Sequence, residues 1–200
     1  INILFFTFFS FNSFSDEIQI ESTNLDIINN GNSVLADNAE ITIPSENIFI
    51  KSKKLKYNKV QKNLIFTNEV IFKDNKNKLN LTSNFLEYKR DDELIYSNGK
   101  TKLNIKNKYN VDSYNIYYAK NLNKIYSEDE TLIEDNENNF YILKNGFELN
   151  LINETIKAKK TIVLDKNNNK YIFKNLFIYL KNNQIAGKEL KVEFEKSYFG

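Results

Sequence analysis

Apolar and polar residues alternate along most of the chain, and this alternation recurs about every fifteen residues. The clearest copies are IKSKKLKY at 50–57, LTSNFLEY at 81–88 and VDSYNIYY at 111–118. In each copy a serine stands two positions after the first apolar residue, and further apolar residues stand three and five positions after the serine. With small adjustments of spacing, this frame fits twelve copies whose central positions lie 13 to 16 residues apart.

The repeat predicts β-strands. Alternation with a period of two is typical of a strand with one buried face, and the recurring Ile, Val, Tyr, Phe and Thr pack well on a pleated sheet. Segments rich in Asn and Asp, such as 29–32 and 165–169, separate the copies and favour turns. Because the turns are short, consecutive strands are expected to pair antiparallel. The sequence therefore predicts an all-β fold of about twelve antiparallel strands.

The phase of the apolar positions changes within each copy. The first apolar residue and the central small residue share one parity, whereas the two later apolar residues share the other. In a straight strand these two sets would lie on opposite faces. We therefore expect every strand to bend or bulge just after its small residue. Twelve strands bent at one place form an open V-shaped β-jellyroll with an apolar interior, or alternatively an elongated sandwich or a solenoid of bent strands.

The apolar positions of the repeat are expected to face this interior. The predicted lining residues are Ile50, Leu55, Tyr57, Ile65, Val70, Phe72, Leu81, Leu86, Tyr88, Val111, Ile116, Tyr118, Ile142 and Leu149. A narrow sandwich would fill the same space with its own side chains. From the pattern alone, both an open groove and a packed core remain possible.

The first fifteen residues, INILFFTFFSFNSFS, differ from the repeat because they are apolar and uncharged. This stretch is shorter than the roughly 20 residues of a membrane span and is typical of the apolar region of a signal peptide. Ser13 and Ser15 supply a small-x-small cleavage pattern. We expect a signal peptide at 1–15 with a truncated start and a mature domain at 16–200. A buried strand or an uncleaved anchor is the alternative.

Composition excludes several kinds of chemistry. The chain has no Cys and no His, so disulfides, thiolate metal sites and Ser-His or Cys-His catalysis cannot occur within it. The net charge of +2 is too small to indicate a nucleic-acid partner. The acidic run at 128–137 lacks the glycine and spacing of a calcium loop, so solvated turns are favoured. We predict no catalytic residues, no metal site and no cofactor, and hence no enzyme.

The bent fifteen-residue strands resemble the OstA-like superfamily, the periplasmic bridge domains of lipopolysaccharide transport. The resemblance covers about 18–200. It rests on the repeat, on the opening segments 18–22 and 34–41, and on the end segment 188–200, which resembles the lead-in to the barrel of an LPS-assembly outer-membrane protein. Many members carry cysteines that join this domain to the barrel. This chain has none, so that cross-link is not implied here.

The resemblance implies a non-enzymatic lipid conduit at the periplasmic face of the outer membrane. Such a protein accepts lipopolysaccharide from a periplasmic bridge protein and passes it along an apolar groove toward the barrel, which has an outer-membrane lipoprotein partner. An open meander leaves an unpaired strand at each end. The N-terminal edge, with Ile18, Ile20, Leu25 and Ile27, is expected to pair with the bridge protein.

Three alternatives stay open. Two belong to the same superfamily: a soluble periplasmic bridge protein and an inner-membrane-anchored one. The third is of another class, a surface adhesin or a carbohydrate-active β-solenoid. Against an enzyme of that last kind, the sequence has no paired carboxylates at recurring inward positions.

Overall fold

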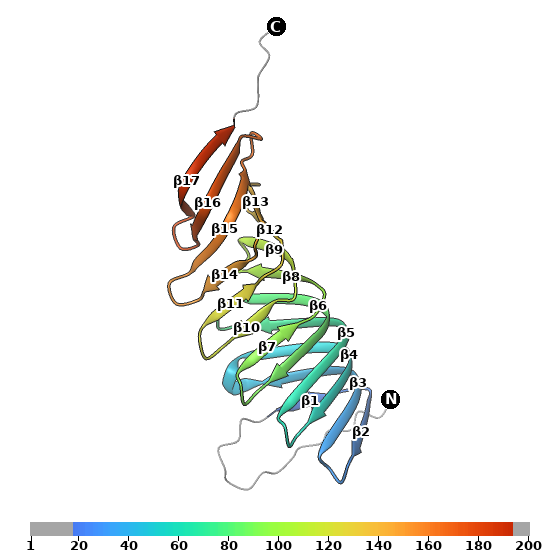
Figure 1. Cartoon of the computed structure of the whole chain (residues 1–200). Coiled ribbons are helices and arrows are strands. Elements are labelled where there is room, and N and C mark those ends of the chain that lie inside the picture. The colour runs from blue at the N-terminus through green and yellow to red at the C-terminus, as the bar shows by residue number, and fades with distance from the viewer. Residues whose placement is uncertain (1–17, 194–200) are drawn as a thin grey trace.

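The computed structural model describes residues 18–193, which form an elongated stack of β-strands (Figure 1). The strands are β1 (Gln19–Glu21), β2 (Asn24–Ile28), β3 (Ser33–Ile43), β4 (Ile48–Asn58), β5 (Asn63–Asp74), β6 (Leu79–Lys89), β7 (Leu94–Ser97), β8 (Lys100–Ile105), β9 (Tyr109–Tyr114), β10 (Tyr117–Ala119), β11 (Lys124–Ser127), β12 (Thr131–Asp135), β13 (Phe140–Leu143), β14 (Phe147–Asn150), β15 (Thr155–Leu164), β16 (Lys170–Tyr179) and β17 (Gln184–Glu193). A short 3₁₀ turn, η1 (Pro44–Glu46), joins β3 and β4. Within 18–193, no helix is both long and apolar enough to cross a bilayer.

The seventeen strands correspond to twelve longer ones. Five pairs of short strands, β1/β2, β7/β8, β9/β10, β11/β12 and β13/β14, are the two halves of single strands interrupted at a bend. Together with the seven continuous strands β3 to β6 and β15 to β17, they reproduce the twelve copies of the sequence repeat. The predicted all-β fold with antiparallel neighbours is confirmed, since every strand pairing is antiparallel.

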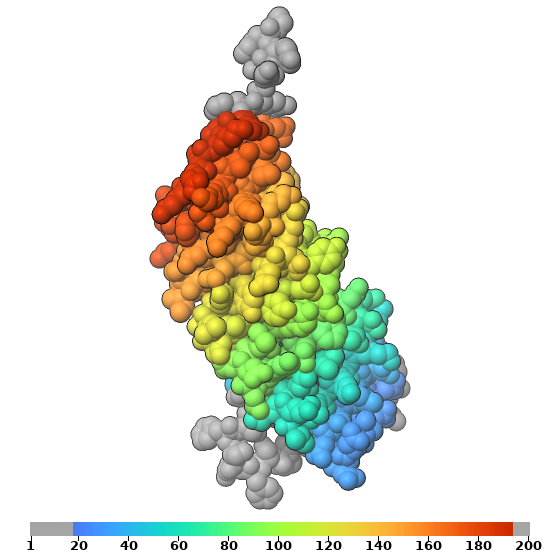
Figure 2. Space-filling view, in the orientation of Figure 1, coloured from blue at the N-terminus to red at the C-terminus, as the bar shows by residue number. Residues whose placement is uncertain are grey.

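The bends divide the sheet into two walls. The first wall contains β2, β7, β10, β11 and β14, and the second contains β1, β8, β9, β12 and β13. Each continuous strand contributes one half to each wall; β6, for example, pairs with β7 through one half and with β8 through the other. The chain advances in sequence order along the elongated body, as the run of colours from blue to red shows (Figure 2).

The predicted change of parity occurs in only some strands. In β3 the buried positions move from Ala36 to Ala39, three residues on, so the parity changes as expected. In β5 they move from Phe66 to Val70, four residues on, and the parity is kept. The β5 bend holds an additional residue, since both Asn68 and its successor have positive φ and the register with β6 shifts there. The prediction that every copy changes parity was therefore wrong.

Two bend lengths account for all ten strands with buried faces. The step between the inward residues on either side of the bend is three residues in β3, β4, β6, β9/β10, β15 and β16, and four residues in β5, β7/β8, β11/β12 and β13/β14. A four-residue step keeps the same side of the backbone facing inward because side chains alternate with period two.

Small residues occupy the inside of the bends, as the repeat predicts. Ser52, Ser83 and Ser113 are buried there. Two of them bond to the backbone just past the bend: Ser52 Oγ donates to the Lys54 oxygen and Ser83 Oγ to the Phe85 oxygen, both at 2.8 Å. A small hydroxyl residue thus fits the corner and ties the two halves of the bend together through a side-chain hydrogen bond to the backbone.

Candidate functional site

The interior between the two walls is where most predicted lining residues lie. Eleven of the fourteen are buried and belong to one continuous hydrophobic core: Ile50, Leu55, Val70, Phe72, Leu81, Leu86, Tyr88, Val111, Ile116, Tyr118 and Leu149. Tyr57 is partly buried and packs against the same core. The repeat pattern therefore identified the inner face of both walls.

Two predicted lining residues, Ile65 and Ile142, face outward instead of into the interior. Ile65 stands between the fully buried Leu64 and Phe66, and Ile142 stands between the buried Tyr141 and Leu143. Because successive strand residues point to opposite faces, both isoleucines lie on the outside of the walls. The cause is the four-residue bend, which places the inward residues of these strands one position away from the slot that the repeat assigns.

Side chains fill the middle of the interior. Around Leu81, whose side chain is only 3% exposed, the remaining space is a void of about 10 Å³ lined by residues such as Phe72, Leu103 and Ile125. That space holds one water molecule at most. In this conformation the walls are closed on each other, so the interior is a packed core rather than an open groove over this stretch.

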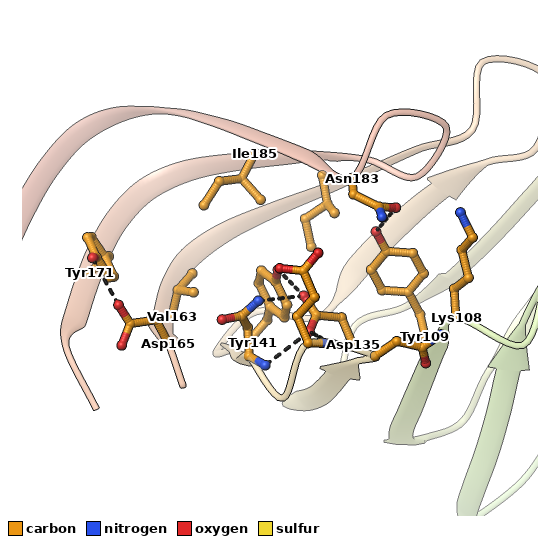
Figure 3. Close-up of a pocket in the computed structure, with 13 residues that line it drawn as sticks. Lys108, Tyr109, Asp135, Tyr141, Val163, Asp165, Tyr171, Asn183 and Ile185 are labelled. Carbon is orange, nitrogen blue, oxygen red and sulfur yellow. Dashed lines mark hydrogen bonds between the residues drawn. The ribbon is translucent and has the colours of Figure 1, made fainter. Parts of the chain in front are cut away.

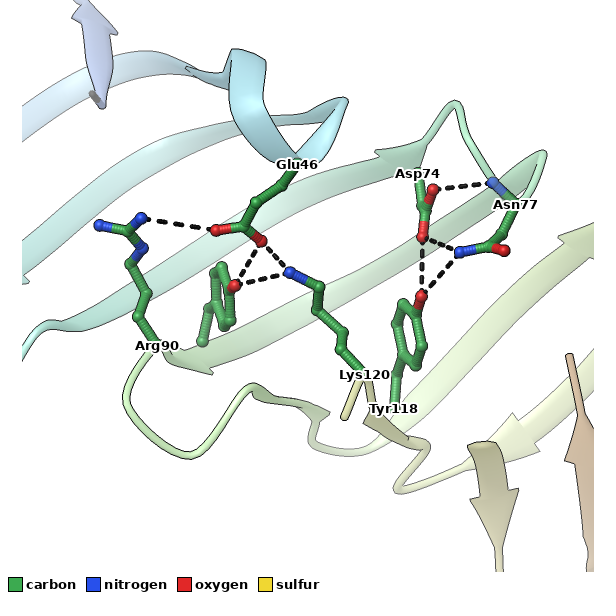
Figure 4. Close-up of polar contacts among 7 residues, drawn as sticks. Glu46, Asp74, Asn77, Arg90, Tyr118 and Lys120 are labelled. Carbon is green, nitrogen blue, oxygen red and sulfur yellow. Dashed lines mark hydrogen bonds and ion pairs between the residues drawn. The ribbon is translucent and has the colours of Figure 1, made fainter. Parts of the chain in front are cut away.

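Polar side chains join the two walls at their free ends, which we call the mouth of the interior. Glu46, from the turn η1 of the second wall, accepts hydrogen bonds from Tyr88 and Lys120 and pairs with Arg90, whose Nη2 lies 3.4 Å from its Oε1 (Figure 4). The ammonium of Lys120 also lies 2.9 Å from the Tyr88 hydroxyl. All three partners of Glu46 come from the first wall. We call these four residues the clasp.

A second polar group crosses the same gap nearby. The Tyr118 hydroxyl of the first wall donates to Asp74 Oδ2 of the second wall at 2.8 Å, and Asn77 donates to both (Figure 4). Burial, followed by the hydrogen bond to Asp74, raises the pKa of Tyr118, so its hydroxyl remains a proton donor. The predicted lining residues Tyr88 and Tyr118 thus have buried rings and hydroxyls that reach the polar rim.

Toward the C-terminal end of the stack, two more contacts join the walls. Lys106 and Glu154 form an ion pair 2.6 Å long, and the Tyr109 hydroxyl donates to Asn183 at 3.4 Å. Next to Tyr109, a cavity of about 300 Å³ lies between the walls (Figure 3). Its lining residues are Lys108, Tyr109, Asp135, Asn136, Glu137, Asn139, Tyr141, Val163, Asp165, Tyr171, Ile178, Asn183 and Ile185.

Two turns beside this cavity are built alike. Asp135 accepts hydrogen bonds from Asn139 and from the hydroxyl of Tyr141, and Asp165 accepts equivalent bonds from Asn169 and Tyr171. Burial acts to raise the pKa of Asp135, but the hydrogen bonds outweigh it and hold the pKa below its ordinary value. The side-chain hydrogen bond from Asn169 likewise lowers the pKa of Asp165. Both carboxylates are therefore ionised acceptors that fix the turns.

Sequence reasoning treated these acids as solvated turn residues and missed the arrangement. A signal was present, because the spacing Asp-x-x-x-Asn-x-Tyr occurs at 135–141 and again at 165–171. The tyrosine falls on an inward position of the following strand, and the aspartate on the last residue of the preceding strand or just after it. The clasp left no such signal, since its partners lie 32 to 74 residues apart in sequence.

The four residues predicted for the N-terminal partner edge differ in exposure. Ile18 and Ile20 pack against the core, whereas Leu25 and Ile27 on β2 are exposed. Within residues 18–193, β2 pairs only with β3 and β17 only with β16, so each has one edge without a strand partner. The predicted unpaired edges are thus present. The predicted signal peptide at 1–15 lies outside the described residues.

Fold and site together define a class of protein: an antiparallel meander folded lengthwise into two walls around an apolar interior, a β-jellyroll. No protein-family model matches the chain, and no curated protein matches it in sequence. Among solved structures, it is similar to LptH, the LptA-homologous periplasmic component of the conserved lipopolysaccharide transport device of Pseudomonas aeruginosa. The match has a TM-score of 0.51 and 13% identity, and covers 76% of this chain and 100% of LptH.

Proposed function

We propose that this chain is a non-enzymatic lipid conduit of the periplasm, which holds the acyl chains of lipopolysaccharide between its two walls. The observation that carries the proposal is the continuous apolar interior, which runs from β3 to β16 and ends in a cavity. The fold shared with LptH supports the same role. On this proposal the chain belongs to the OstA-like superfamily.

In its finer form, the proposal is that residues 16–200 of this sequence are the periplasmic domain of an LPS-assembly outer-membrane protein of the LptD type. The exposed edge of β2 would receive a strand from a periplasmic bridge protein through main-chain hydrogen bonds. The chain would then pass lipopolysaccharide toward a barrel that has an outer-membrane lipoprotein partner. A soluble bridge protein is the second candidate, favoured by the coverage of the whole of LptH.

The packed interior sets a condition on this function. An acyl chain that reaches Leu81 must separate the walls, because the void there is far smaller than an alkyl chain. The lost contacts between side chains are replaced by contacts with the acyl chain, so the apolar cost of opening is largely offset.

Site-specific photo-crosslinking in cells tests the conduit. A diazirine residue of about leucine size at Leu81 should capture glycolipid, whereas the same residue at Ile65, which is also apolar but lies on the outer face, should not. Capture at Ile65 without capture at Leu81 would overturn the proposal and leave the interior an ordinary core.

A further inference from the structure

The cavity at the C-terminal end of the interior differs from the rest of the space between the walls. Its volume of about 300 Å³ is thirty times that of the void around Leu81. It begins where the Tyr109–Asn183 hydrogen bond ends the series of contacts across the mouth. A ligand can therefore enter here without separating the clasped part of the walls.

The floor of the cavity is apolar. Val163 and Ile178 are buried, Ile185 of β17 is exposed toward the cavity, and the ring of Tyr141 is buried beside them (Figure 3). At about 30 Å³ for each group of the size of water or methylene, the cavity of about 300 Å³, which the apolar floor shares with the rim, accommodates at most about ten methylene groups. That volume is enough for one medium alkyl chain and not for several.

The rim of the cavity is polar and carries mainly negative charge. Asp135, Glu137 and Asp165 contribute three carboxylates, and Lys108 contributes the one ammonium among the lining residues. Asp135 and Asp165 are held ionised by their hydrogen bonds. A phosphate or sulfate at this rim would meet like charges, whereas hydroxyl groups could bond to the exposed carboxylate of Glu137 and the amides of the rim.

We propose that this cavity binds one alkyl chain of an amphiphile whose headgroup at the rim is an uncharged, hydroxyl-rich sugar. The inference rests on the proposed function in taking the interior as a lipid site, and deepens it by naming the place of entry and the headgroup. On this proposal, the negatively charged rim makes the C-terminal end of the interior select the saccharide part of a glycolipid over its anionic groups.

Two amphiphiles of equal chain length test the assignment. Binding of decyl maltoside and of decyl sulfate to the purified chain is measured by calorimetry below their critical micelle concentrations. We expect decyl sulfate to bind about tenfold more weakly, because it meets the rim carboxylates. The Glu137→Lys variant should narrow this difference, since it changes two units of charge on an exposed turn.

A matched pair of variants on β17 locates the binding. Ile185→Trp places a bulkier side chain in the cavity and should weaken binding of decyl maltoside, whereas Leu190→Trp, on the same strand but outside the cavity lining, should leave it unchanged. Equal affinity for the two amphiphiles, or unchanged binding by Ile185→Trp, would overturn the assignment.

The outcomes separate this inference from the conduit itself. Glycolipid capture at Leu81 in cells, combined with no Ile185-dependent binding of decyl maltoside, would reject the cavity and keep the conduit. Binding in the cavity without capture at Leu81 would reject the conduit and keep the cavity as a separate amphiphile site.

Discussion

Replacing Glu46 with glutamine should weaken the attachment between the two walls. Glu46 is a carboxylate that Tyr88, Arg90 and Lys120 share across the mouth. Glutamine keeps the size of the side chain but removes its negative charge, and its amide NH2 group faces one of the two cations, because Arg90 and Lys120 contact different oxygens of Glu46. The clasp would then lose the carboxylate that lies between the cations of Arg90 and Lys120.

The magnitude follows from the burial of the three charged groups. Their side chains are only 12 to 16% exposed. Removing one partner from a fully buried pair costs about 3–5 kcal/mol. Because these groups retain some contact with water, we expect the free energy of unfolding to fall by about 2–3 kcal/mol. Tyr88→Phe removes only one hydroxyl and should cost about 1 kcal/mol.

Urea unfolding at neutral pH measures the effect, with an exposed pair as the control. Lys53 and Glu69 form an ion pair on the outer surface, with side chains 54% and 71% exposed. Such pairs contribute about 0–1 kcal/mol and are screened by salt. Glu69→Gln should therefore change the unfolding free energy little, and less still at high salt, whereas the Glu46→Gln loss should persist.

The comparison between the two variants decides the matter. If Glu46→Gln and Glu69→Gln lowered the unfolding free energy equally, the clasp would be one more surface ion pair. The polar contacts at the mouth would then have no part in holding the walls together.

Two further predictions concern the core and the turns. Leu81→Ala should lower the unfolding free energy by about 2–5 kcal/mol, as for a packed leucine, whereas Leu132→Ala, on an exposed outer position, should cost under about 1 kcal/mol; equal losses in urea unfolding would contradict a packed interior. The pKa of Asp135 lies below its ordinary value of 3.8 when folded, so its ionisation contributes stability that is present above pH 3.8 and is lost as the pH falls below it. Unfolding free energies of Asp135→Asn should therefore depend less on pH than those of the unmodified chain in that acidic range, and parallel pH profiles would refute this.

The strands and their inner faces were predictable because burial imposes a period of two on every wall. The four-residue bends were not. In β5 the two residues with positive φ are Asn68 and Glu69. Asparagine commonly adopts this conformation, but glutamate does not, so the sequence gives no sign that the bend is longer. A one-residue difference in the bend was enough to place Ile65 on the outer face.

The polar contacts at the mouth were beyond sequence reasoning for a different reason. Tyr88 and Tyr118 fit the apolar repeat, and their rings are indeed in the core. What their hydroxyls contact depends on how the second wall folds over the first, which brings Glu46 and Asp74 within reach. A periodic pattern specifies the face on which a side chain lies, but not the partner at its tip.

Core and clasp therefore oppose opening of the walls in different ways. An acyl chain that enters the interior can replace the contacts that residues such as Leu81 lose, because dispersion and apolar burial do not depend on which apolar group supplies them. It cannot replace the charge of Glu46 opposite Lys120 and Arg90. If the chain is a conduit, the apolar part of the opening cost is offset by the cargo, and the polar part is not. The clasp, rather than the core, would then set the equilibrium between the closed interior and one that holds lipid.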